Sequence, residues 1–600
     1  MQVQRFRRGL AQVVSVGAII VAARIASADG FGLTPVTNAN PKTVGFNAPN
    51  VLSPELVELI AAQGSIPLEN GTAVIPYYGY DGNGPHMPPL GSNVEATKTE
   101  PDKNTYLVFK HGLSGPDASY DYGTHFVYQG HENGAPVALP GAPAGTTING
   151  SYITRINLDA DGAHRVTLLA TQTDAGVPLQ RIDGSGWDPF AQKLLFTTET
   201  GFASVPSGQP SQPSPSIYQA TPDFPSSVQD ISNVIGRGGF EGVQNDYKGN
   251  VYLVEDVGGA NGTGANARTK QPNSFLYRFK PTTPSNLQAG GKLQALQVIV
   301  GGSPLTFTQP ASSSAADIAA AANTDISGAN SAGYVSLHQY GTTLTTKWID
   351  INTTTSATPF PGADDNALAK EAGATPFKRP ENLAFRPGSD FKELYFAETG
   401  DTDNRTCAGG GPAPNPNLPA CTTPNVTGGF TTIFKLIQSP TSNTGSISVF
   451  YNGDQAHAGF DNVAFFSKDQ IAFVEDAGDT LHTQRNALDS AYLFDVTQDY
   501  SLGAQPVRFI AEGRDSAATV DSGLSGSTGF QNDGDNEITG LYVSDGDTSK
   551  QGLLGESSPK LFRENGEWRA FWTQQHGDNV TYELIAAPDL ADRHGEHWDD

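Results

Sequence analysis

Acidic side chains recur at matching places in five segments of the chain, each close to the end of a short apolar run. The segments are Gly186–Glu199, Phe240–Asp256, Pro380–Thr399, Phe460–Asp476 and Glu537–His576. In two of them the first acid and the glutamate near the end are 14 residues apart, Glu241 to Glu255 and Asp461 to Glu475. Calcium accepts six to eight oxygen ligands in irregular geometry, so carboxylates from separate segments suit it. The repeated acids therefore predict a cation site that is assembled from distant parts of the sequence.

The candidate metal ligands are the acids at these positions, together with Glu132 at the end of an expected strand over His125–Gln129. The full set is Glu132, Glu199, Glu241, Glu255, Asp256, Glu381, Glu398, Asp461, Glu475, Asp476 and Glu537. So many carboxylates near one axis would repel one another unless they were protonated or neutralised by cations. Any single one of these acids could instead cap a strand or bind the backbone of a turn.

Two basic side chains stand beside the acids. His131 precedes Glu132 and could act as a ligand or a base, or simply as a structural hydrogen-bonding group. Arg379 precedes Pro380 and Glu381, where it could bind a phosphate or pair with Glu381. The sequence contains no HExxH, GxSxG or P-loop pattern. Serine-hydrolase and nucleotide-binding folds therefore lack support.

The five segments share one plan, which is a polar entry, a short apolar strand, a Gly/Asp-type turn and a second strand that ends in acids. A composition of 67 glycines and 41 prolines is typical of many short strands joined by tight turns. We expect an all-β protein, a β-propeller whose repeats direct equivalent acids into a central metal-binding channel. A few short helices should lie in insertions, and Pro281–Asn366 should hold a poorly marked blade. The expected helices are Leu56–Ala62 after Ser53-Pro54, Asp317–Ala322 and Ala367–Ala372.

The N-terminus has the pattern of a secretory signal over residues 1–28. A cationic start with Arg7-Arg8 is followed by an apolar run and by Ala26-Ser27-Ala28, a small-residue cleavage site. The arginine pair favours twin-arginine export over the general secretory route, which stays open. We expect residues 29–94 to be an N-terminal extension, 95–590 the propeller and 591–600 a tail. The protein should be exported to the periplasm or the exterior.

Charge and cysteine content narrow the partners. Removal of residues 1–28 takes away four arginines and no acid, so the formal net charge changes from −26 to −30. Such a surface repels nucleic acid and anionic lipid, and no later segment is apolar enough to span a membrane. We expect a monomer that acts on a small molecule. The two cysteines, Cys407 and Cys421, are expected to form one disulfide in an oxidising compartment.

At these same residues the chain resembles the PhoX family of alkaline phosphatases, as separated motifs over about residues 100–580. The motifs are His131-Glu132, Trp187 with Thr197–Glu199, Glu241 with Tyr252–Asp256 and Leu276–Phe279, Gly373–Glu381 with Tyr395–Thr399, Asp461-Asn462 with Glu475-Asp476, and Glu537–Gly540 with Gln575–Gly577. Gly373–Glu381 is the closest and resembles the family's arginine-proline-glutamate segment. The resemblance implies a six-bladed propeller that hydrolyses small phosphate monoesters at an iron–calcium cluster, and twin-arginine export.

The sequence departs from the family at its iron-ligating cysteine, because Arg181–Trp187 contains none. We therefore expect Ca²⁺, with Fe³⁺ in doubt. Glu199, Glu241, Glu381, Asp461 and Glu537 would be the ligand core, and Glu255, Asp256, Glu475 and Asp476 would add ligands or hold them. Arg379, Glu381 and His131 are the candidate catalytic residues. The alternatives are a calcium-dependent lactonase or phosphotriesterase, and a calcium-stabilised binding propeller without activity.

Overall fold

The structure is a computed structural model of an almost entirely β protein. It describes residues 32–587 except 43–48, 83–97, 135, 139–146, 200–201, 204–211, 214–215, 264–269, 328, 356–363, 402–429, 514–536, 553–557, 563–566 and 576–578. The expected signal, Cys407, Cys421, His576 and the tail lie outside this part of the chain.

Antiparallel four-stranded meanders follow one another along the chain. The first contains β3 (Thr105–Val108), β4 (His125–His131), β7 (Tyr152–Asn157) and β8 (Val166–Ala170), and the second β9 (Ile182–Asp188), β10 (Lys193–Thr198), β13 (Ile217–Ala220) and β14 (Val228–Asp230). The third contains β15 (Phe240–Asn245), β16 (Val251–Glu255), β17 (Leu276–Pro281) and β18 (Gly290–Val300), and the fourth β21 (Pro380–Phe385), β22 (Glu393–Glu398), β23 (Thr432–Ile437) and β24 (Thr444–Asn452). The fifth contains β25 (Phe460–Phe465), β26 (Gln470–Glu475), β27 (Ser490–Asp495) and β28 (Val507–Ala511), and the last β29 (Glu537–Ser544), β30 (Arg569–Gln575), β31 (Val580–Ala586) and β2 (Leu56–Ala62).

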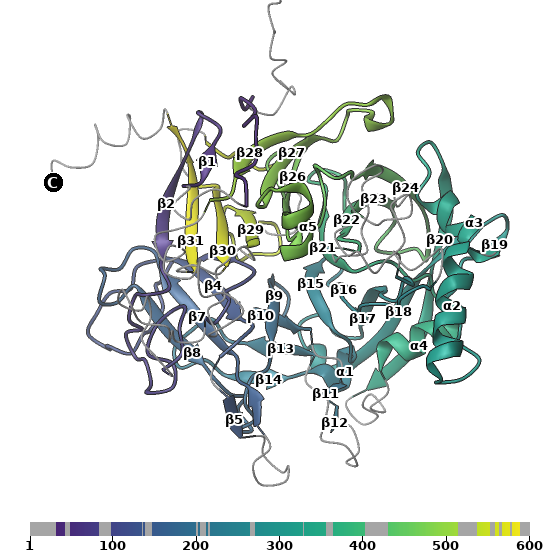
Figure 1. Cartoon of the computed structure of the whole chain (residues 1–600). Coiled ribbons are helices and arrows are strands. Elements are labelled where there is room, and N and C mark those ends of the chain that lie inside the picture. Colours follow the sequence, from purple (N-terminus) through teal and green to yellow (C-terminus); the bar gives the residue numbers. More distant parts are fainter. Residues whose placement is uncertain are drawn as a thin grey trace, which may run out of the picture.

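The meanders surround a common centre, as Figure 1 shows. Their first strands contact one another in the closed series β3, β9, β15, β21, β25, β29 and back to β3. This is the arrangement of a β-propeller, and the predicted fold class is confirmed. The predicted number of six blades stays a prediction, because the third and fourth meanders share one hydrogen-bonded sheet.

The N-terminal stretch completes the last sheets. Strand β2 pairs antiparallel with β31, and β1 (Val51–Leu52) pairs with β28 (Figure 1). The predicted helix over Leu56–Ala62 is therefore wrong. Ser53-Pro54 is a local signal for a helix start, but pairing with β31 decides the structure instead. The backbone groups at the edge of β31 need hydrogen-bond partners, and β2 supplies them.

The segment between β17 and β21 holds an insertion rather than a separate blade. Its long strand β20 (Thr343–Thr355) pairs with both β18 and β24 and so joins two meanders. The helices α2 (Ala315–Ser327) and α4 (Asp365–Ala372) confirm two predicted helices, and α3 (Ala329–Leu337) lies beside α2. The shorter elements are α1 (Ser232–Ile235), α5 (Gly478–Arg485), the 3₁₀ turns η2 (Leu287–Ala289) and η3 (Tyr500–Leu502), and the strands β5 (Pro136–Ala138), β6 (Thr147–Asn149), β11 (Phe202–Ala203), β12 (Gln212–Pro213) and β19 (Ser303–Pro304).

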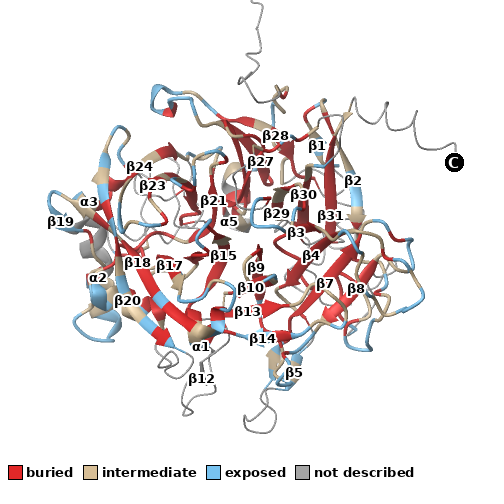
Figure 2. Ribbon diagram, turned by 180° about the vertical axis from the view of Figure 1, so that it is seen from behind, coloured by how far each residue is buried: buried red, intermediate tan, exposed pale blue. Residues whose placement is uncertain are grey.

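The hydrophobic core is divided between neighbouring meanders. Leu195 of β10 packs in one cluster with Leu253 of β16, and Phe509 of β28 in another with Trp572 of β30. Figure 2 shows the burial concentrated on the strands, while the connecting loops are exposed. Face-to-face packing of this kind fixes each first strand against its neighbours at the centre. Among the described residues no helix is long and apolar enough to cross a membrane.

Two leucines of β2 provide a test of its role in the core. Leu56 is 5% exposed and packs in the cluster with Trp572 and Leu584, whereas Leu59 is 41% exposed. We expect Leu56→Ala to lower the free energy of unfolding by about 2–5 kcal/mol. The control Leu59→Ala should change it by less than about 0.5 kcal/mol. Urea denaturation at fixed calcium measures both, and equal losses would contradict the placement of β2.

Candidate metal centre

One set of acids lies at the start of the first strands. Asp183, Glu241, Glu381 and Asp461 are each the second residue of β9, β15, β21 and β25, and Glu537 is the first residue of β29. In β9, β15, β21 and β25 the register shifts beside the acid, as between Phe240 and Val243 in β15, whereas in β29 it shifts after Thr539. A β-bulge re-aims the side chain beside it, so this recurrent irregularity turns equivalent carboxylates to the same side.

A second set of acids follows the end of the second strands. Glu132, Glu199, Asp256 and Asp476 come directly after the last residues of β4, β10, β16 and β26. Each second strand runs antiparallel to the first strand of its own meander, so its end lies beside the start of that strand. The two sets of acids are thereby brought to one end of the channel.

Three groups of carboxylates from both sets have oxygens within 4.8 Å of one another. The groups are Asp102, Glu132 and Asp183; Asp183, Glu199 and Glu241; and Glu241, Asp256 and Glu381. Successive groups share Asp183 and Glu241, so they form one continuous cluster across four meanders. Every donor in these groups is a carboxylate, which is the chemistry that calcium prefers.

Burial and mutual repulsion disfavour the ionised forms of these acids. Burial, and then Asp461, raises the pKa of Asp102 to about 8. Burial, and then Glu381, raises the pKa of Glu241 well above its usual value, and Glu537 is raised by burial and Asp476. Carboxylates in this state bind cations readily, because a cation offsets the repulsion that otherwise protonates them. The residues therefore fit a metal centre.

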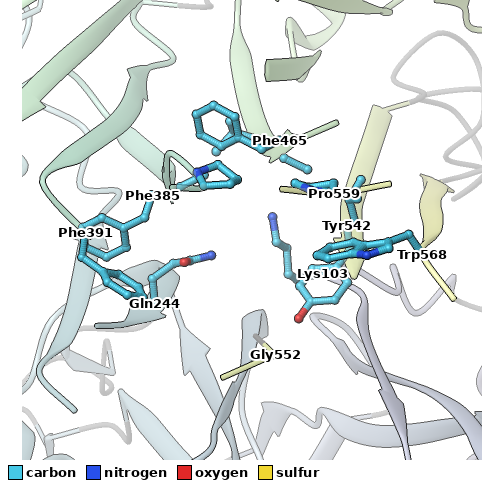
Figure 3. Close-up of a pocket in the computed structure, with 14 residues that line it drawn as sticks. Lys103, Gln244, Phe385, Phe391, Phe465, Tyr542, Gly552, Pro559 and Trp568 are labelled. Atoms are coloured by element: carbon cyan, nitrogen blue, oxygen red, sulfur yellow. The ribbon is translucent and has the colours of Figure 1, made fainter. Parts of the chain in front are cut away.

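Lys103 lies between the carboxylate cluster and a neighbouring cavity. Its ammonium donates a hydrogen bond of 2.8 Å to Asn462 Oδ1, and Asn462 in turn donates to Asp461. Burial lowers the pKa of Lys103 to about 8, against the attraction of Asp461 and Asp102. Its amino group points into a cavity of about 100 Å³ that Phe385, Phe465 and Trp568 also line (Figure 3). The ammonium of Lys103 thus lies between the carboxylates and a cavity whose lining includes both aromatic and polar side chains.

Arg379 lies on the cluster. Its Nε is 2.9 and 3.0 Å from the two carboxylate oxygens of Asp256, and its Nη2 contacts Glu381. Although burial works against its charge, Asp256 and Glu381 hold the pKa of Arg379 well above its usual value. The sequence left open whether Arg379 pairs with Glu381 or serves a phosphate. In the structure it pairs with Glu381 and also with Asp256.

Three further acids, all of them candidate ligands, belong to none of the three groups and have other partners. Glu255 Oε2 accepts hydrogen bonds from Tyr277 and from Asn366 of α4, both at 3.0 Å. Glu475 pairs with Arg485 of α5 at 2.9 Å. Glu398 lies 2.7 Å from Nε2 of His338, next to α3. Each is the last residue of a second strand, and its side chain anchors that strand end to an insertion.

The predicted catalytic His131 is buried behind Glu132. Its Nδ1 is 3.2 Å from Thr99 Oγ1 and its Nε2 is 2.9 Å from Thr154 Oγ1, and the ring stacks on Tyr152. Both nitrogens are therefore occupied by hydroxyls, and burial lowers the pKa of the ring well below its usual value. The structure does not bring His131 into the carboxylate groups.

Sequence reasoning missed Asp102 and Asp183, which belong to two of the three groups. Asp183 lies within Arg181–Trp187, the segment that contains no cysteine. The pair Ile182-Asp183 repeats the apolar-acid pair Phe240-Glu241. Likewise Pro101-Asp102 repeats Pro380-Glu381. An alignment of the repeats on these pairs would have found both residues.

Comparisons with known proteins place the chain in a family. The sequence profile described as alkaline phosphatase PhoX matches residues 222–549, which is more than half of the chain. The chain belongs to the PhoX alkaline phosphatase family. This membership supports a phosphatase activity and a dependence on metal, and the matched span includes Glu241, Asp256, Glu381 and Asp461.

One solved structure shows the same fold as this PhoX-family chain. Pseudomonas fluorescens PhoX in complex with vanadate, a transition state analogue, is 11% identical with a TM-score of 0.51, over 92% of this chain and 98% of that one. Sqt1 from Chaetomium thermophilum is 10% identical over 77% and 93%, with a TM-score of only 0.27. No curated protein sequence matches.

Glu241 and Glu255 provide a matched test of the assignment, since they lie 14 residues apart in one meander. Glu241 belongs to two of the carboxylate groups and Glu255 to none. We expect Glu241→Gln to weaken calcium binding by more than about 10-fold, as removal of groups that support a metal already costs that much. Glu255→Gln should leave calcium binding unchanged. Equilibrium dialysis with elemental mass spectrometry measures both, and equal losses would contradict the assignment.

The stability of the metal-free protein should depend on pH in an unusual direction. Burial, then Asp461, raises the pKa of Asp102 to about 8, and burial, then Asp364, raises that of Glu255 to about 8. Between about pH 5 and pH 8 the folded chain keeps protons that the unfolded chain has released, so stability falls as pH rises. We expect the melting temperature after chelation to decrease across this range. Saturating calcium should make the melting temperature less dependent on pH. A chelated protein that is most stable at pH 8 would contradict the claim that its buried carboxylates keep their protons in this range.

Proposed function

We propose that this protein is an exported phosphatase that hydrolyses phosphate monoesters at a calcium centre in the propeller channel. The observation that carries the proposal is the cluster of three carboxylate groups with Arg379 bound to two of its members. Family membership supplies the reaction class. The secretory pattern predicted for residues 1–28 supports export to the periplasm or the exterior.

Calcium is the metal that the donors favour. The three groups offer carboxylate oxygens, and the stretch that lacks a cysteine provides Asp183 in the cluster. Oxygen ligands suit hard cations, whereas thiolates select softer ones. We therefore propose Ca²⁺ as the resident metal, held by Asp102, Glu132, Asp183, Glu199, Glu241, Asp256 and Glu381. Asp461 and Glu537 adjoin this set through the charge interactions described above.

The chain contributes positioning and charge to the reaction. Bound calcium would polarise the phosphoryl oxygens and lower the pKa of a nucleophilic water. Arg379 would donate to the phosphoryl oxygens, where negative charge is present in the transition state. Asp256 and Glu381 orient the guanidinium, and the backbone of Arg379 is itself fixed at φ 52°.

Turnover of p-nitrophenyl phosphate before and after chelation, with elemental analysis of the same sample, tests the proposal. We expect bound calcium, activity that is lost on chelation and restored by calcium, and inhibition by vanadate. Arg379→Met should lower kcat by about 100- to 1000-fold, as loss of one preorganised donor does. Calcium binding without turnover of any phosphate monoester would overturn the phosphatase. Turnover of lactones without release of phosphate would instead favour a calcium-dependent lactonase.

A further inference from the structure

The backbone two residues before the first-strand acids has an unusual conformation in several meanders. Arg181 and Arg379 have φ of 32° and 52°, and they precede Asp183 and Glu381 by two residues. The equivalent Gly459 has φ of 68°. Glycine adopts such values without strain, whereas other L-residues rarely do. Two arginines are therefore kept at positions where glycine would be the easier residue, which points to a need for their side chains.

The two arginines contact the groups that share Glu241. Arg181 Nη2 lies 3.0 Å from Glu199 Oε2, and Glu199 belongs to the group with Asp183 and Glu241. Arg379 contacts Asp256 and Glu381, which form the next group with Glu241. The two guanidinium groups thus contact acids of the two groups that share Glu241.

The meander between them places no side chain at the equivalent position. Strand β15 contacts both β9 and β21, which follow Arg181 and Arg379, and the residue two before its acid is Gly239. A Cβ there would lie 2.8 Å from the carbonyl oxygen of Glu199 and 3.1 Å from that of Asp256. The close backbone therefore excludes a side chain between the arginines.

Both arginines can be reached by a solute. The side chain of Arg181 is 49% exposed and that of Arg379 is 21% exposed. A guanidinium has five N–H donors in a planar fork, so the ion pair of Arg181 with Glu199 uses only part of its capacity. Each guanidinium carries one positive charge. Two of them therefore match the two negative charges of a phosphate monoester dianion better than the single charge of a phosphate diester.

We propose that Arg181 is a second phosphate-binding residue, which grips the substrate's phosphoryl group together with Arg379 across Glu241. The inference rests on the proposed function and narrows it to dianionic phosphate monoesters. Arg181 would select for the second negative charge, and Asp183 would fix the strand start from which its side chain projects.

Arg181→Gly separates this role from a structural one, since it removes the guanidinium and also the strained backbone. At saturating calcium we expect an unchanged or higher melting temperature and unchanged calcium content. The inhibition constant of orthophosphate should rise more than about 10-fold, with a larger loss in kcat/KM for monoesters than for diesters. Arg181→Lys, which keeps the charge, should lose less, and Lys292→Met, which removes an exposed charge elsewhere, should lose nothing.

The outcomes distinguish this inference from the proposed function. A lower melting temperature and less calcium in Arg181→Gly, with unchanged phosphate inhibition, would overturn the inference and make Arg181 a structural partner of Glu199. Normal monoester turnover and inhibition in that variant would also overturn it, while the phosphatase stands. Calorimetric binding of orthophosphate that weakens in Arg181→Gly would support the inference even in a protein that turns over no monoester.

Discussion

Repulsion between buried carboxylates is the constraint around which this propeller is arranged. Two unit charges 4.8 Å apart repel by about 3.5 kcal/mol at an effective dielectric constant near 20, and the groups share members, so several such pairs coexist. A few pairs would equal the whole stability of an ordinary domain, about 5–15 kcal/mol. The cluster therefore requires protons or cations. Lys103 below it and Arg181 and Arg379 on it supply only part of the compensating charge.

The insertions help to hold this unfavourable arrangement in place. Glu255, Glu398 and Glu475 are equivalent residues at strand ends, yet their partners differ chemically: an amide, an imidazole and a guanidinium. Those partners come from α4, from the residue after α3 and from α5. The strand ends carry Asp256, Thr399 and Asp476 as their next residues. In these three meanders a different partner therefore fixes the end of the second strand, and the residue that follows that end faces the centre.

The sequence alone indicated the acids, but it could not say which of two neighbours faces the channel. Glu255 and Asp256 are adjacent, and adjacent side chains on a strand point to opposite sides. Which one turns inward depends on the bulge and on partners such as Asn366, 111 residues away. The predicted ligands Glu241, Asp256 and Glu381 do come together in one group. Asp102 lies in an irregular segment before β3, so the repeating strand pattern of the sequence did not identify it as a ligand.

Local signals also failed where a distant partner decided the structure. Ser53-Pro54 has the form of a helix start, yet Leu56–Ala62 pairs with a strand more than 500 residues further on. Propensity is a weak prior that tertiary pairing overrides. The insertion between β17 and β21 is a similar case, since nothing in its composition reveals that β20 would bridge two meanders.

The pairing of β2 with β31 has a consequence for biosynthesis. The ring can close only after residues close to the C-terminus have left the ribosome, and the carboxylates on either side of the closure, such as Asp102 and Glu537, meet only then. While the chain is being synthesised, the ring that holds the three carboxylate groups is therefore still open. If closure precedes transport, the centre first equilibrates with the scarce free calcium of the cytoplasm. If it follows transport, the centre first meets the calcium-rich exterior, so the compartment of folding determines its first ion.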